Sequence, residues 1–163
     1  IRYRGSQPGT LLLECLYLLD CASGNELQSS RYLPPTTIRV VLEEQGSSHE
    51  KDLSHNLIQH SRTAVNADIA DRIIRAKETT LRQLIIQCEE TARTQAPEIL
   101  ASAHQRSEQI LNREINRLRA LRQVNPNVRS EEIDFFIQRR EMLERALDSA
   151  SLRLDAVRVI VAT

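Results

Sequence analysis

Apolar and small residues recur every three or four positions from Asn66 to Ser151, which is the spacing of helices with one buried face. The pattern predicts helices over about 66–95, 97–122 and 131–151. The last two have similar lengths and are joined by the short break Val124-Asn125-Pro126-Asn127. We therefore expect them to form an antiparallel helix hairpin.

Individual residues set the expected ends of these helices. Pro97 lies inside the long apolar pattern, and an interior proline removes one backbone hydrogen bond and clashes with the preceding turn. We therefore predict a kink or a short break near Ala96. Asn66 is expected to cap the first helix and Ser130 the last, because their side-chain oxygens can accept a hydrogen bond from the first turn.

Shorter apolar segments near the two ends predict strands. The run 10–21 is almost continuously apolar, whereas 37–44 and 155–162 alternate with a period of two. Since a bare strand edge invites aggregation, we expect the last strand to pair with one of the first two. The predicted fold class is α+β: a small antiparallel or mixed sheet of about three strands, with a long helical excursion between the second and third.

The length of 163 residues fits a single domain, 1–163. In this prediction 1–45 and 154–163 supply the sheet, and 64–152 supplies the helical part. The chain starts at Ile1 and not at a methionine, so we expect a fragment of a larger protein. The pattern leaves the strand order and the oligomeric state open.

Composition narrows the classes of partner. The formal net charge is zero, so the chain has no bulk attraction to nucleic acid or to an anionic membrane. Aromatic residues make up 3% of the chain, which disfavours a surface that stacks bases. No apolar run approaches the ~20 residues that cross a bilayer, and we expect no membrane partner. Three cysteines without metal-like spacing favour a reducing compartment.

No motif predicts a catalytic, cofactor or metal site. A phosphate-binding loop needs glycines followed by Lys and Ser or Thr, and the sequence has no such pattern. The four histidines (His49, His55, His60 and His104) lack the spacing of a metal-ligand set, and those in the polar loop are interpreted as solvated. We therefore expect no catalytic residue, no cofactor and no metal in this segment.

The clearest local charge asymmetry lies at the tip of the predicted hairpin. Five arginines there form a candidate interaction surface: Arg113, Arg117, Arg119, Arg122 and Arg129. One interpretation is a basic stripe that grips RNA or DNA phosphates. We favour a second one, in which positive charge near one helix C-terminus and negative charge near the next N-terminus complement the helix dipoles.

Three parts of the sequence resemble a known family. They are Gly9–Asp20 (GTLLLECLYLLD), Arg31–Leu42 (RYLPPTTIRVVL), and Leu118–Glu132 (LRALRQVNPNVRSEE) with the closing Leu152–Thr163 (LRLDAVRVIVAT). In this order they resemble the C-terminal region of the RapA family, which are bacterial RNA polymerase-associated ATPases of the Swi/Snf helicase-like class.

The resemblance implies a non-catalytic module of a larger DNA translocase. Such a parent protein would bind core RNA polymerase and use ATP with Mg²⁺ to help the polymerase recycle, in the bacterial cytoplasm. Its ATP-binding motifs would lie in upstream motor domains, so no catalytic residue carries over to this chain. The implied partners of the segment are core RNA polymerase and the protein's own motor domains. A nucleic-acid-binding helical arm is the alternative.

Overall fold

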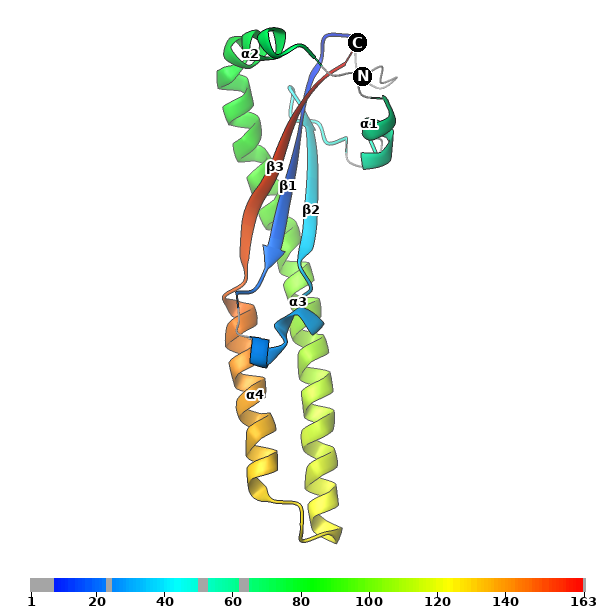
Figure 1. Cartoon of the computed structure of the whole chain (residues 1–163), viewed down its shortest axis with the longest axis vertical. Helices are drawn as coiled ribbons and strands as arrows, with labels where there is room; N and C mark the ends of the chain where they lie inside the picture. The colour runs from blue at the N-terminus through cyan, green and yellow to red at the C-terminus, as the bar shows by residue number, and fades with distance from the viewer. Residues whose placement is uncertain (1–7, 23–24, 50–52, 62–64, 163) are drawn as a thin grey trace. The chain divides into compact units, whose positions relative to one another are not determined.

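The structure is a computed structural model, and it describes residues 8–22, 25–49, 53–61 and 65–162. The strands are β1 (Leu11–Asp20), β2 (Thr36–Glu43) and β3 (Ser151–Val161). The α-helices are α1 (His55–Ser61), α2 (Ala67–Ala76), α3 (Glu78–Val124) and α4 (Ser130–Asp148). Two short 3-10 helices are η1 (Asn25–Leu27) and η2 (Ser29–Arg31). The predicted α+β class is confirmed, and all three predicted strands are present (Figure 1).

The strands form one antiparallel sheet in the order β2-β1-β3. The prediction that the last strand pairs with an early one is confirmed. The backbone N–H of Gly9 donates to the carbonyl of Ala162 at 2.7 Å, and the N–H of Ala162 donates to the carbonyl of Thr10 at 2.9 Å. β1 is the central strand, and its residues 11–15 are buried on both faces, which explains the almost continuous apolar run in its first half.

Different elements cover the two faces of β1. On the odd-numbered face, the Tyr17 hydroxyl donates to the carbonyl of Ile85 in α3 at 3.5 Å, and the Cys15 thiol is hydrogen-bonded to Cys88 of the same helix. On the even-numbered face a smaller core includes residues from α1 and the segment before it. Its members are Leu12, Val41, Leu53, Ile58, Ile160 and Ala162.

The contacts of the chain gather into two compact units, each made of separate segments. One comprises Ile1–Leu18, Thr37–Gln95 and Arg153–Thr163, and the other Leu19–Thr36 and Ala96–Leu152. The first unit contains most of the sheet with α1, α2 and the N-terminal part of α3. The second contains the rest of α3, all of α4, and η1 and η2. The single domain over 1–163 stays a prediction.

The second unit contains the predicted helix hairpin. Apolar side chains of α3, α4 and the connection between them close its tip: Ile115, Leu118 and Ile133, with Val128, Phe136 and Ile137 packed against them. Farther along α4, η1 and η2 pack against the helix. The apolar periodicity of the sequence therefore identified the hairpin correctly.

Of the kink or short break that we predicted near Ala96, the break is wrong, and the kink stays a prediction. α3 continues without interruption from Glu78 to Val124, and Pro97 lies inside it. A proline costs about 3 kcal/mol inside a helix. The apolar stripe stays in phase across it, with Ala92 and Ala96 buried before it and Ala103 after it, and this packing holds the helix together. The helical run breaks instead at Lys77, between α2 and α3.

Two element ends also differ from the prediction. Ser130 is the first residue of α4 and not its cap: Arg129 is the N-cap, and its backbone N–H donates to Glu132 Oε1 at 3.3 Å. α4 ends at Asp148 and β3 begins at Ser151, so the strand is longer than the predicted 155–162. The long partner strand β1 explains this extension, because ladder pairing can override local propensity. The Asn66 cap is confirmed by a 2.9 Å bond from the Asp68 N–H.

Candidate interaction surfaces

A carboxylate is buried in the middle of the sheet. Glu14 of β1 is 1% exposed, and it lies inside the apolar run that built the central strand. Arg39 of β2 donates through Nε to Glu14 Oε1 at 2.6 Å, and Arg158 of β3 places Nη1 3.0 Å from Glu14 Oε2. His55, at the start of α1, lies 3.7 Å from Oε1. We call Arg39, Glu14 and Arg158 the charged row.

The register of the sheet explains why these side chains meet. Pairing of Thr10 with Ala162 in antiparallel strands places Glu14 opposite Arg158. Both oxygens of the carboxylate are occupied, as burial of a charge requires. Two guanidinium groups thus flank one carboxylate. The Arg39 and Arg158 side chains are 19% and 32% exposed, although the Nη2 atom of Arg39 and the Nη1 atom of Arg158 are buried.

The sequence patterns did not predict the charged row. The available signal was a single carboxylate, Glu14, inside a long apolar segment. A buried carboxylate needs a positively charged or hydrogen-bonding partner. The two arginines that pair with Glu14 follow it by 25 and 144 positions, too far for a local sequence pattern to connect them. Alternation alone placed Arg39 and Arg158 on mixed faces of their own strands, and only the register between strands brings them together.

Beyond the charged row, the same face of the sheet is less covered. Leu16 and Leu18 follow Glu14 on the even-numbered face of β1, and both are only half-buried. Leu154 and Ala156 occupy the corresponding positions of β3, and both are exposed. Leu154 shows 41% of its surface. This side therefore presents apolar side chains next to the charged row.

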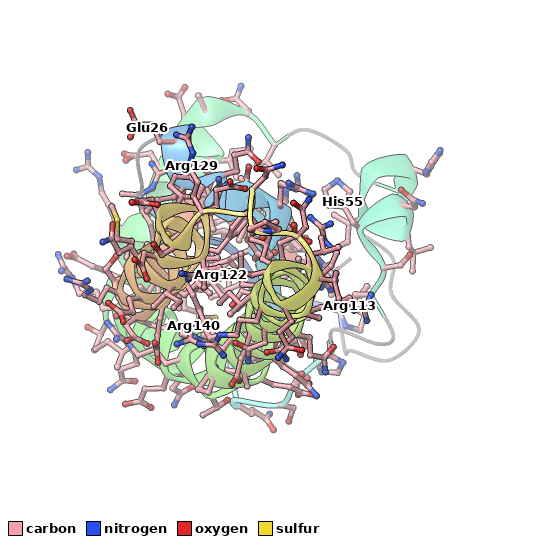
Figure 2. The ribbon with its side chains drawn as sticks, turned by 90° about the horizontal axis from the view of Figure 1, so that it is seen from below. Glu26, His55, Arg113, Arg122, Arg129 and Arg140 are labelled. Carbon is pink, nitrogen blue, oxygen red and sulfur yellow. The ribbon has the colours of Figure 1, made fainter. Side chains whose placement is uncertain are left out.

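The predicted arginine surface does not form one stripe. All five residues are exposed: Arg113, Arg117, Arg119, Arg122 and Arg129. Arg113 and Arg117 are about one turn apart and share a side of α3, whereas nine residues, or about two and a half turns, separate Arg113 from Arg122. Figure 2 shows Arg113 on the side of α3 away from α4, and Arg122 between the two helices. Arg129 belongs to the connection before α4.

Neighbouring polar side chains pair with arginines of the hairpin. Arg117 donates through Nε to Glu114 Oε2 at 3.0 Å, and this guanidinium lowers the pKa of the Glu114 carboxyl. On the facing helix, Arg140 donates to Asn112 Oδ1 at 2.7 Å. The charge of Arg117 is thus largely balanced within α3, as expected for a solvated helix surface.

The histidines have polar partners at separate places. His49 Nε2 lies 2.6 Å from Glu43 Oε2, and His104 Nε2 lies 3.2 Å from Asp148 Oδ1. His60 Nδ1 lies 2.7 Å from the carbonyl of Asn56. Among the residues that the structure describes, no group of three or more His, Cys, Asp or Glu side chains could hold a metal ion.

Two thiols and a phenol lie beneath α3. Cys15, Cys88 and Tyr17 are all almost fully buried. The hydrogen bond from Cys88 lowers the pKa of Cys15, against the opposite effect of burial. Burial and the neighbouring Cys15 raise the pKa of Tyr17. The cluster packs the central strand against the helix.

The hollows of the two units are shallow. One lies in the first unit and is lined by Leu42, Gly46, Gln87, Glu90, Thr91 and Thr94. The other lies in the second unit and is lined by Tyr32, Leu33, Pro34, Thr36, Ile99, Ser102, Ala103 and Arg106. Neither lining contains a histidine or cysteine that could serve as base or nucleophile. In the described part of the chain, no helix is long and apolar enough to cross a membrane.

Comparison with known proteins gives a match over the whole chain. The family described as RNA polymerase recycling family C-terminal matches residues 1–162. The chain belongs to this family. Three RNA polymerase-associated proteins named RapA are similar to it: 34% identical over 95% of the chain in Erwinia tasmaniensis, 35% over 94% in Pasteurella multocida, and 32% over 95% in Pectobacterium atrosepticum.

This member of the RNA polymerase recycling family is short beside these relatives. It spans 16% of the length of each of the three. The segments that carried the family resemblance in the sequence now have places in the fold. Gly9–Asp20 contains the central strand β1, Arg31–Leu42 contains most of β2, and the closing segment contains most of β3. Leu118–Glu132 spans the tip of the hairpin.

Proposed function

We propose that this chain is the non-catalytic C-terminal module of a RapA-like, ATP-dependent RNA polymerase recycling factor. It contributes to polymerase binding or regulates the upstream ATPase motor. The observation that carries this proposal is the family match over residues 1–162, together with relatives whose names describe them as RNA polymerase-associated. The chain spans a small share of those relatives, so their other segments are available for the chemistry.

The surfaces of the chain support an interaction role. The half-buried and exposed apolar side chains of β1 and β3 lie next to the charged row. Apolar area and charge together are typical of protein interfaces. The two hollows described above are shallow, and neither is lined by a histidine or a cysteine. ATP and Mg²⁺ would bind to the motor domains of the longer protein, which would act in the bacterial cytoplasm.

Deletion of the module from the longer protein tests this proposal. We expect the deletion variant to retain its motor domains but to bind immobilised core RNA polymerase more weakly, or to hydrolyse ATP at a changed rate. Both quantities are measured on the intact and deleted proteins at equal concentration. If polymerase binding and the ATPase rate are both unchanged, the proposal is wrong. Nucleotide turnover by the isolated chain would also contradict it.

A nucleic-acid-binding arm is the weaker proposal. It needs the arginines of the hairpin to act on one phosphate backbone, and α3 directs Arg113 and Arg122 to opposite sides (Figure 2). The paired Glu114 removes a further part of the positive charge. Its test is the salt dependence of binding to DNA and RNA.

A further inference from the structure

The strand β3 lies at one edge of the sheet, since the strand order among the described residues is β2-β1-β3. It is 11 residues long and contains no proline or lysine, two residues that commonly block an edge. Its charged residues are Arg153, Asp155 and Arg158. Two of its apolar side chains are also exposed, Leu154 at 41% and Val157 at 44%. They lie on opposite faces of the strand.

The register tells which backbone groups face outward. Ala162 donates its N–H to Thr10 of the β1 segment. Since side-by-side residues alternate between bonded and non-bonded pairs, the even-numbered residues of β3 bond to β1. The odd-numbered residues Arg153, Asp155, Val157 and Val159 therefore direct their N–H and C=O groups away from the sheet. These groups form a ladder that an additional strand could complete.

The side chains define the chemistry of that additional strand. On the even-numbered face it would lie beside Leu154, Ala156 and Arg158. The Arg158 side chain is 32% exposed, so a carboxylate on the added strand is favoured beside its positive charge. On the odd-numbered face it would lie beside Val157 and Val159, where apolar side chains are favoured.

We propose that the open edge of β3 binds an extended segment of a partner protein as a fourth strand. The segment places a carboxylate beside Arg158 and apolar side chains beside Leu154 and Val157. Backbone hydrogen bonds to β3 give affinity, and the alternating side chains give specificity. The inference rests on the proposed function and deepens it, because it assigns the surface on which RNA polymerase would be held.

A charge placed on the exposed edge tests the proposal. Val157→Lys introduces the kind of side chain that natural edge strands use to prevent pairing, at a position that is already exposed. In the full-length protein we expect binding to core RNA polymerase to weaken at least tenfold, as measured by surface-immobilised titration. The matched control is Thr37→Lys, on the exposed surface of β2 at the other edge of the sheet, which should retain affinity within twofold.

The outcomes separate this inference from the proposed function. If module deletion weakens polymerase binding but Val157→Lys does not, the module functions through another surface and the edge proposal is wrong. Weakening by Thr37→Lys alone would equally overturn it. If deletion has no effect on either binding or ATPase rate, the proposed function itself fails. Circular dichroism and the unfolding midpoint of each variant confirm that its fold is intact.

Hydrogen exchange of the full-length protein supplies an independent readout. When core RNA polymerase binds, we expect exchange at the odd-numbered amides Arg153, Asp155 and Val157 to slow at least tenfold, while the even-numbered amides stay slow throughout. Odd-numbered amides that remain fast in the complex overturn the proposal. It is also overturned if they are already slow without polymerase, because another segment or a second copy then covers the edge. Slowing caused by DNA or RNA instead of polymerase would overturn it as well.

Discussion

At the scale of the residue, Glu14 is the position where the fold depends most on one charge. Replacement by glutamine keeps the shape but leaves two guanidinium groups facing a neutral amide. Breaking a buried ion pair costs about 3–5 kcal/mol, and we expect about 3 kcal/mol because Arg39 and Arg158 both reach solvent. Urea denaturation of Glu14→Gln measures the loss in the free energy of unfolding.

Two further variants show that the loss comes from burial of the charges. Glu78→Gln removes a carboxylate from an exposed pair with Arg82, and it should change stability by no more than about 0.5 kcal/mol. The triple variant Glu14→Leu, Arg39→Met and Arg158→Met should recover most of the stability, since apolar groups often replace a buried ionic cluster without loss of stability. An unchanged midpoint in Glu14→Gln would contradict the role of the charged row.

Tyr17 gives the stability of the protein a dependence on alkaline pH. Burial raises its pKa in the folded state above the ordinary value of 10.0, so the folded protein holds a proton that the unfolded chain releases. The resulting stabilisation is complete below pH 10 and declines as the pH rises above it. We expect urea unfolding at successive pH values from 8 to 11 to show this decline, and Tyr17→Phe to reduce it. An equal decline in both proteins would contradict the prediction.

At the scale of the element, Pro97 shows how packing overrides local preference. The residue lacks an N–H for the preceding turn, yet α3 passes through it. We expect Pro97→Ala to stabilise the protein by up to about 3 kcal/mol, because the side chain is exposed and the substitution restores one backbone bond. Thermal unfolding measures the change. A lower melting temperature would mean that the native helix requires the proline geometry.

The start of α4 provides a second test of an element. Glu132 accepts a bond from the Arg129 N–H and lies in the first turn, where negative charge is favourable. Glu132→Ala should therefore cost about 0.5–1 kcal/mol. Ser130→Ala should cost less, since Ser130 is the first helical residue and does not cap the helix. A larger loss for Ser130→Ala, measured by urea denaturation, would restore it as the cap.

These elements also show what sequence alone can supply. A continuous apolar run identified the first strand, and a period of two identified the other two. Spacings of three and four identified the hairpin, because such spacings record which side of a segment is buried. They did not identify Glu14 with its two arginines, since that cluster depends on the register of three strands far apart in the chain. Nor did they show that the arginines of α3, which are close in sequence, point to different sides of the helix.

At the scale of the whole molecule, the zero net charge and the division of the arginines between sides of the hairpin both predict weak attraction to nucleic acid. The largest set on one side of α3 is Arg106, Arg113 and Arg117, and Glu114 pairs with the last of them. Any attraction to DNA or RNA must therefore come from few residues.

Salt titration makes this argument quantitative. Each neutralised phosphate of duplex DNA contributes about −0.9 to the slope of log K against log salt, so five arginines acting together would give about −4.5. Because no more than three share a side, we expect a slope no steeper than about −2.7 for the isolated chain. Arg113→Gln with Arg117→Gln should remove most of this weak binding, whereas Arg119→Gln with Arg122→Gln should change it little. A slope near −4.5, lost equally in both double variants, would show that the divided arginines act as one surface.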